Sequence, residues 1–200
     1  MAHTSFLTAS EVEDLGLGSH GDGVLISRFA SLHHPELIHV GTNVRIDDFV
    51  ILTTGESGRI DIGSHVHIAA FAALFGGGGI TVESYVGISA RGTVYSTNDD
   101  YSGAHLTGPT VPTEYTGVSI APVSLRKHAL LGAHCVVLPG VSIGEGVAVG
   151  ALSLVDRSLE AWGIYAGIPA TFIKARSRAL LSLEQQHRAA TGDSVDASGD

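Results

Sequence analysis

The chain has 200 residues, a net charge of −9 and one cysteine, and only 16% of its residues are charged. This length fits a single domain, and the negative charge disfavours nucleic acid or an anionic membrane as partner. No apolar run reaches transmembrane length and Met1–Ser10 lacks a signal-peptide pattern. We therefore expect a cytoplasmic protein with one domain over residues 1–190 and a disordered tail over residues 191–200.

The first predicted element is a short helix near the N-terminus. Thr8 and Glu11 have the spacing of a capping box, in which the two side chains bind the first free backbone N–H groups of a helix. The helix is expected from about Ala9 to Leu15, with Gly16 as its stop. It should cover the open strand edges at the start of the following structure.

Aliphatic residues then recur at every sixth position, which is the period of neither a helix nor an ordinary strand. The series are Val40, Ile46 and Leu52; Ile62, Ile68, Leu74 and Ile80; Val82, Ile88 and Val94; and Leu125, Leu131, Val137, Ile143, Val149 and Val155. A six-residue unit cannot bury its own apolar face, so stacked units must share one core. The pattern predicts an all-β solenoid and disfavours a β-sandwich with coincidental spacing. Cys135 falls on an inward position, which favours a core role over that of a nucleophile.

Two segments leave this period. Residues 97–117 are rich in Gly, Pro, Thr, Asp and Tyr, and we expect them to form an extruded loop. An interruption of this length in a regular solenoid is usually functional. Residues 176–190 are expected to form a helix with Leu180 and Leu183 on one face and Gly192 as its stop.

The end of the chain resembles a known family. Leu131-Gly-Ala-His-Cys-Val-Val-Leu-Pro-Gly, Val149-Gly-Ala-Leu-Ser-Leu-Val and Gly167-Ile-Pro-Ala170 are similar to the last coils and closing motif of hexapeptide-repeat acyltransferases, in particular the maltose and galactoside O-acetyltransferase group. Ile168 stands where that group usually has asparagine. Over about residues 36–175, the resemblance implies a left-handed parallel β-helix, acetyl-CoA as donor, no metal, and a homotrimer with active sites between subunits.

The resemblance also implies where acetyl-CoA binds. Ala133 and Ala151 match positions whose backbone contacts the pantetheine arm, and small residues allow such a close approach. Arg157 and Lys174 match positions near the phosphates and adenine, where cations suit an anionic ligand. Without the resemblance, corner packing for the alanines and solvated charge for the two cations would be the simpler interpretation.

Transfer to a hydroxyl requires a base, and histidine is the side chain best matched to this task at neutral pH. The family's usual histidine aligns with Asp99, which is a weak base unless its surroundings raise its pKa. We therefore expect His67, at an outward position, to be the catalytic base, with Asp99 or Asp100 orienting it or binding the acceptor. His105 and His134 are the reserve candidates, and His67 can equally be a solvent-facing histidine.

The loop offers groups for the acceptor. Asn98, Asp100 and Tyr101 combine hydrogen-bonding groups with an aromatic face, which suits a sugar, and Glu114 and Tyr115 extend this set. The loop resembles that of acetyltransferases encoded with surface-polysaccharide pathways, which implies O- or N-acetylation of a sugar or nucleotide-linked amino sugar. A structural loop that bridges subunits is the alternative.

Three other functions stay open on the sequence. A xenobiotic acetyltransferase of the chloramphenicol type shares the implied fold. A carbonic-anhydrase-like trimer would need three histidines converging on zinc, from pairs such as His34 with His39 and His65 with His67. A non-catalytic trimer is the third.

Overall fold

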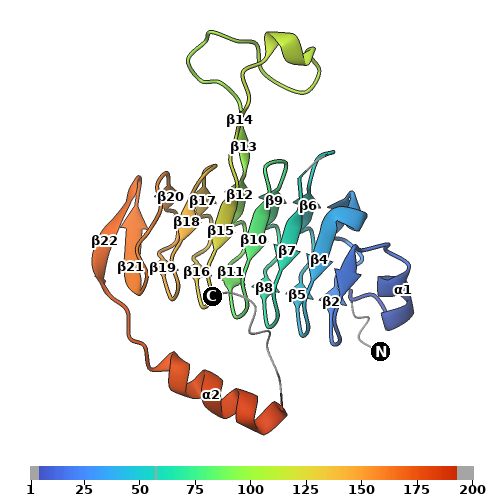
Figure 1. The fold of residues 1–200 in the computed structure, drawn as a ribbon, viewed down its shortest axis with the longest axis vertical. Helices are drawn as coiled ribbons and strands as arrows, with labels where there is room; N and C mark the ends of the chain where they lie inside the picture. Colours follow the sequence, from blue (N-terminus) through green and yellow to red (C-terminus); the bar gives the residue numbers. More distant parts are fainter. Residues whose placement is uncertain (1–4, 57, 193–200) are drawn as a thin grey trace.

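The computed structural model describes residues 5–56 and 58–192, and its short strands stack into three sheets that form a solenoid (Figure 1). The first sheet contains β1 (Ser19–His20), β4 (Ile38–Val40), β7 (Ile60–Ile62), β10 (Ile80–Val82), β15 (Val123–Leu125) and β18 (Ser142–Ile143). The second contains β2 (Leu25–Ile26), β5 (Arg45–Ile46), β8 (His67–Ile68), β11 (Gly87–Ile88), β16 (Leu130–Leu131), β19 (Ala148–Val149), β21 (Gly163–Gly167) and β22 (Ala170–Ala175). The third contains β3 (Ser31–His33), β6 (Ile51–Thr53), β9 (Ala73–Phe75), β12 (Thr93–Tyr95), β17 (Val136–Val137) and β20 (Leu154–Val155).

The predicted period is confirmed as the inward row of the solenoid. The six residues of its uninterrupted series, Leu125 to Val155, are at most 3% exposed. Parallel pairing brings equivalent residues of successive coils into register, as with Val94 and Val137 of β12 and β17. Cys135 is fully buried, as expected, and its thiol donates to the carbonyl of Gly150.

The chain turns between sheets at corners that use left-handed backbone conformations. Among residues 5–56 and 58–192, eleven non-glycine residues have positive φ, and they include Phe49, Phe71, Arg91, His134 and Leu152. These five follow strands of the second sheet in successive coils, so they form one row along the corner between the second and third sheets. We call this edge the second corner. It carries most of the residues that the site requires.

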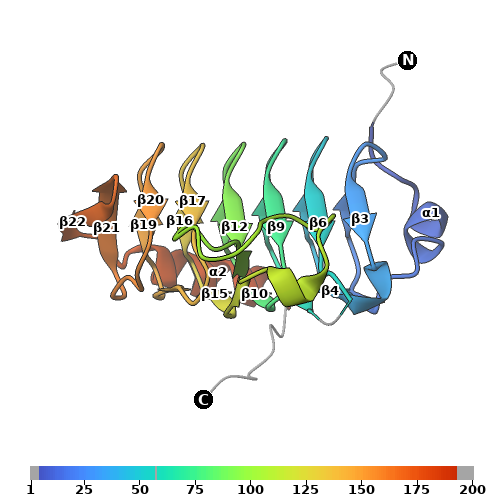
Figure 2. The ribbon, with the colours of Figure 1, turned by 90° about the horizontal axis from the view of Figure 1, so that it is seen from above.

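Helix α1 (Ala9–Glu13) begins with the predicted capping box, in which the Thr8 hydroxyl accepts from the N–H of Glu11. It ends two residues before the expected Leu15. Its buried residue is Val12, which joins the core cluster of the solenoid. The helix lies at one end of the row of strands, while β21 and β22 lie at the other (Figure 2).

One long loop leaves the solenoid after β12. Its base is a two-stranded antiparallel hairpin of β13 (Thr97–Asn98) and β14 (Ser119–Ile120), and its far part contains the 3-10 helix η2 (Thr113–Tyr115). The loop projects away from the body on the side opposite helix α2 (Figure 1). A second 3-10 helix, η1 (Pro35–Leu37), follows β3.

Helix α2 (Leu180–Thr191) begins four residues later than expected and ends at the predicted stop, Gly192, which has φ 70°. Before the helix, the Arg176 guanidinium donates to the carbonyl oxygens of His128, Gly146 and Val147, which ties this residue to the solenoid. Contrary to expectation, Leu183 is 63% exposed and Glu184 is the buried residue of the helix. Residues 193–200 of the expected tail lie outside the described residues. Neither helix in the described ranges is long and apolar enough to cross a membrane.

Candidate active site

The two alanines implied in coenzyme binding lie next to each other on the second corner. The N–H of Leu152 donates to the carbonyl of Ala133 at 2.9 Å, so the corner of β19 stacks directly on that of β16. A Cβ on Gly132 would lie 2.5 Å from the nitrogen of Ala151, so only glycine fits between these turns. The result is a narrow edge of small residues and backbone, which an extended thin ligand can approach closely.

The closing motif packs beside the same edge. The Ser153 hydroxyl donates to the carbonyl of Gly150 at 2.7 Å and accepts from the N–H of Gly167 at 3.0 Å. This holds the turn Gly167–Ala170 against the corner of Ala151, with Ile168 pointing outward at 76% exposure. The sequence motif and the alanine edge therefore form one continuous surface.

The two expected cations do not lie together within the chain. Arg157 follows β20 of the third sheet and pairs with its neighbour Asp156, Nε to Oδ1 at 3.0 Å, which lowers the pKa of that carboxyl. Lys174 lies on the edge strand β22 of the second sheet, opposite Ile164. Both are exposed, and they lie on different sheets, with β21 between the strand of Lys174 and β19, which precedes Ala151.

His67 has a carboxylate partner within its own chain that sequence reasoning missed. Its Nε2 lies 2.8 Å from Oδ2 of Asp47, and the His67 side chain is 52% exposed. Burial acts to raise the pKa of Asp47, but hydrogen bonds from His67 and Arg45 outweigh it and hold that pKa below its usual value. The pair is visible only when successive coils are aligned, because Arg45 and His67 are register partners on β5 and β8.

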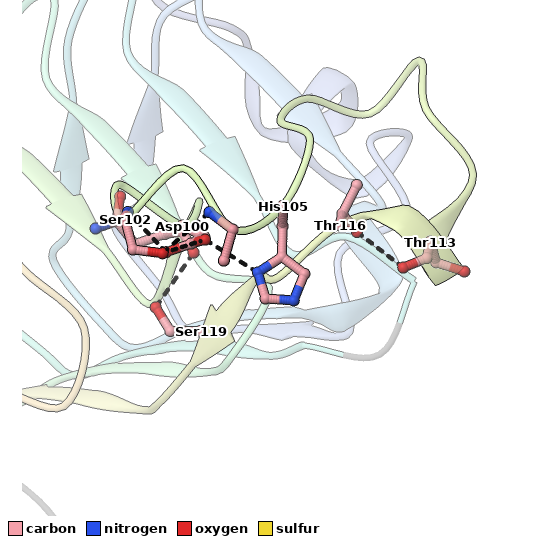
Figure 3. A network of polar contacts seen from close by, with 8 residues as sticks. Asp100, Ser102, His105, Thr113, Thr116 and Ser119 are labelled. Atoms are coloured by element: carbon pink, nitrogen blue, oxygen red, sulfur yellow. Dashed lines mark hydrogen bonds and ion pairs between the residues drawn. The ribbon is translucent and has the colours of Figure 1, made fainter.

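Asp100 organises the loop rather than facing outward. Its carboxylate accepts from the N–H of Ser102 at 2.9 Å and from the Ser102 hydroxyl at 2.8 Å, and it lies 3.0 Å from Nδ1 of His105 (Figure 3). The hydrogen bond with His105, followed by those from Ser102, holds the pKa of Asp100 far below its ordinary range. Asp100 and the reserve histidine His105 thus have a structural role in the free chain.

The other expected acceptor residues lie around this network. The carbonyl of Asn98 accepts from the Ser119 hydroxyl at the base of the loop (Figure 3). Tyr101 is 87% exposed. The exposed Asp99 carboxylate accepts a long hydrogen bond of 3.5 Å from the N–H of Gly108, which leaves it with acceptor capacity toward a ligand.

The histidine pairs considered for zinc have separate partners. His39 binds the Ser19 hydroxyl and His34 lies beside Glu36, while His65 stacks on Tyr85 and His67 pairs with Asp47. Within residues 5–56 and 58–192, no group of three or more His, Cys, Asp or Glu side chains is arranged to hold a metal ion.

Comparison with known proteins gives a consistent result, although no family model matches the chain. The chain is 41% identical over 192 residues to dTDP-4-amino-4,6-dideoxy-D-glucose acyltransferase of Escherichia coli, covering 96% of this chain and 100% of that protein. It is 28% identical over 144 residues to the putative lipopolysaccharide biosynthesis O-acetyl transferase WbbJ of the same species, covering 72% of this chain and 71% of WbbJ.

A solved structure agrees over nearly the whole chain. AntD, an N-acyltransferase from Bacillus cereus in complex with dTDP and 3-hydroxybutyryl-CoA, superposes with a TM-score of 0.91 at 46% identity, covering 96% of this chain and all of AntD. Another AntD complex holds dTDP-4-amino-4,6-dideoxyglucose and coenzyme A, with a TM-score of 0.90. The solenoid described above is therefore the left-handed β-helix of these acyltransferases.

Proposed function

Because this chain belongs to the hexapeptide-repeat acyltransferase family, we propose that it transfers an acyl group from an acyl-coenzyme A thioester to the amino group of a dTDP-linked 4-amino-4,6-dideoxy sugar. The observation that carries the proposal is the similarity over nearly the full length to the Escherichia coli and Bacillus cereus enzymes. The first is an acyltransferase of this aminosugar nucleotide, and the second has been solved with this aminosugar nucleotide and coenzyme A. The product would be an N-acylated nucleotide sugar, a building block of the kind that surface-polysaccharide synthesis consumes.

An amine acceptor fits the loop better than a hydroxyl. A neutral amine is itself a good nucleophile, so attack on the thioester does not require a strong base. The C–N bond forms, the C–S bond breaks, and the proton lost by the nitrogen passes by way of a nearby carboxylate to the departing thiolate. The histidine expected in the loop, whose place Asp99 takes, is dispensable in this reaction.

Asp99 and Ser89 are the residues we assign to the acceptor amine. The AntD variants that were crystallised replace a serine and an aspartate ten residues apart. Ser89 and Asp99 are the only serine and aspartate in this chain with that order and spacing. Ser89 follows β11 on the second corner, and its N–H donates to Leu131 immediately before Gly132 and Ala133. It therefore lies one coil away from the alanine edge that we assign to the pantetheine arm.

We assign the complete site to the groove between two subunits of a homotrimer. Asp99 lies in a loop that leaves the body at the corner between the third and first sheets, whereas Ser89 and Ala133 lie on the second corner. The loop also exposes apolar side chains, with Tyr101 at 87%, Leu106 at 58% and Tyr115 at 57%. A neighbouring subunit that covers these side chains would bring its second corner to Asp99. In this assembly, Arg157 and Lys174 of adjacent chains contribute to the coenzyme phosphates.

The test is thiol release from acetyl-CoA with dTDP-4-amino-4,6-dideoxyglucose, dTDP-glucose and chloramphenicol as acceptors. Of these three acceptors, we expect only dTDP-4-amino-4,6-dideoxyglucose to cause thiol release. Asp99→Asn should lower kcat/KM by about 100-fold, the scale of a lost proton-transfer group. His67→Gln should have the smaller effect, and exposed Asp22→Asn is the matched control. Release with chloramphenicol alone, or undiminished activity of Asp99→Asn, would contradict the assignment.

A further inference from the structure

Three phenylalanines form an exposed ladder on the second corner. Phe29, Phe49 and Phe71 follow strands β2, β5 and β8, and their rings stack with centroid separations of 5.6 and 5.0 Å. The side chains are nevertheless 51%, 50% and 49% exposed. Stacking uses the ring faces, so the ring edges stay open to solvent and make a continuous apolar stripe.

The fold does not require aromatic residues at this row. Phe49 and Phe71 have φ of 61° and 63°, a conformation that costs a bulky residue roughly 1–2 kcal/mol and that suits glycine or asparagine. Other coils fill equivalent positions with Arg91, His134 and Leu152. Half-exposed phenyl groups on an unfavourable backbone add little to the core, so their presence points to a ligand.

A cation extends the ladder on the side of the proposed reaction centre. The Arg91 guanidinium lies 4.9 Å from the ring centroid of Phe71. No carboxylate of residues 5–56 and 58–192 forms an ion pair with Arg91, whereas Arg28, Arg45 and Arg126 each have an acidic partner. Arg91 directly follows Ser89 and Ala90, and the N–H of His134, next to Ala133, donates to Ala90. Along the second corner, the phenylalanine stripe is therefore followed by the cation Arg91. Next to Arg91 lie Ser89, assigned to the acceptor amine, and Ala133, assigned to the pantetheine arm.

We propose that the ring edges of Phe49 and Phe71 are the platform for the thymine base of the acceptor nucleotide, and that Arg91 binds its diphosphate. This inference rests on the proposed function and assigns that acceptor a position. Successive coils are about 4.8 Å apart, so the corner of Ala133 lies roughly 10–14 Å from Phe71 and Phe49. A nucleoside diphosphate joined to a hexose spans a distance of this order between its base and its sugar amine.

The chemistry of the row matches that ligand. The edge of a phenyl ring carries partial positive charge and packs well against the π face of a base laid across it. A guanidinium has the planar fork of donors that binds phosphate oxygens, and its contact with Phe71 holds it on the corner. The ring edges carry no hydrogen-bonding group, so selection for the base must come from shape or from residues of a neighbouring chain.

The experiment measures binding of dTDP, thymidine and coenzyme A to the full chain by calorimetry. The variants are the double substitution Phe49→Leu with Phe71→Leu, and Arg91→Gln. Leucine suits both positions because Leu152 already occupies the same row with φ 60°. The control is Phe172→Leu, a phenyl group 60% exposed on β22 and outside the ladder.

We expect the double variant to bind dTDP and thymidine about tenfold more weakly, with coenzyme A binding unchanged. Arg91→Gln should weaken dTDP binding by about tenfold and leave thymidine binding unaffected, because thymidine has no phosphate. Wild-type affinity for dTDP in the double variant, with aminosugar transfer intact, would overturn the platform and leave the proposed function standing. A changed molecular mass in light scattering would instead make the ladder a contact between copies of this chain. Failure of the wild-type protein to bind dTDP would overturn both proposals.

Discussion

Replacing Glu184 with alanine should release helix α2 from the solenoid while leaving the solenoid folded. The Glu184 carboxylate lies 2.6 Å from Nζ of Lys127 and 2.8 Å from Nε2 of His128. Glu184 is the buried residue of α2, whereas Leu183 beside it is exposed, so this carboxylate is a central attachment of the helix, next to the half-buried Leu180 and Leu181. The ring of His187 supplies further contacts, because it lies nearly perpendicular to the rings of His65 and Tyr85.

The expected cost follows from what the deletion leaves behind. Breaking a buried ion pair costs about 3–5 kcal/mol, because the remaining charge stays desolvated. The side chains of Glu184 and His128 are each 7% exposed, but that of Lys127 is 32% exposed and can regain water. We therefore expect Glu184→Ala to reduce the free energy of α2 docking by about 3 kcal/mol, the low end of that range. This corresponds to about a 100-fold shift in the docking equilibrium.

The contribution of the Glu184 carboxylate should also depend on pH. Burial acts to raise the pKa of Glu184, but hydrogen bonds from Lys127 and His128 outweigh it and lower the pKa below its ordinary 4.5. A carboxyl with a depressed folded-state pKa stabilises the docked helix fully above its ordinary pKa. That contribution is lost as the pH falls through the depressed value. Protonation of Glu184 should therefore weaken docking as the pH falls below about 4.5.

Amide hydrogen exchange along residues 180–191 measures this directly. Glu184→Ala should accelerate exchange in α2 by about 100-fold at neutral pH and leave the strands of the solenoid protected. Glu184→Gln should have an intermediate effect, because an amide keeps the shape and part of the hydrogen bonding. Gln185→Ala, exposed on the same helix, is the control. Unchanged exchange in Glu184→Ala, or equal acceleration in Gln185→Ala, would refute the reasoning.

Two further predictions concern the core and the loop. Burial raises the pKa of the Cys135 thiol, so it should react with a thiol reagent at neutral pH only after unfolding, and rapid labelling of the native protein would contradict its inward position. Asp100→Asn should loosen the loop by weakening its contacts with Ser102 and His105, so that proteolysis within residues 99–118 becomes severalfold faster. An unchanged cleavage rate would show that other contacts hold the loop.

The inward row was predictable because one simple constraint governs it. Each six-residue unit must send an aliphatic side chain to the common core, and any other residue there would leave a cavity or a buried polar group. The series from Leu125 to Val155 therefore marks the core directly. The capping box at Thr8 was equally visible, since its hydrogen bonds join residues three apart in the chain.

The outward rows were not predictable in this way, because solvent tolerates almost any residue there. The partners on these rows are separated by a whole coil, and the coils differ in length. Phe49 lies 20 residues after Phe29, whereas Phe71 lies 22 residues after Phe49. A fixed period therefore does not reveal the ladder, nor does it pair His67 with Asp47.

The sequence by itself thus determined the solenoid, its core and the family resemblance, because these depend on short-range spacing and local motifs. Only the tertiary structure decided which outward residues meet. It brought Ala133 beside Ala151, joined α2 to the solenoid through Glu184, and aligned the phenylalanine ladder with Arg91. The physical reason is that coil stacking sets these contacts, and stacking is driven by the core residues beneath them.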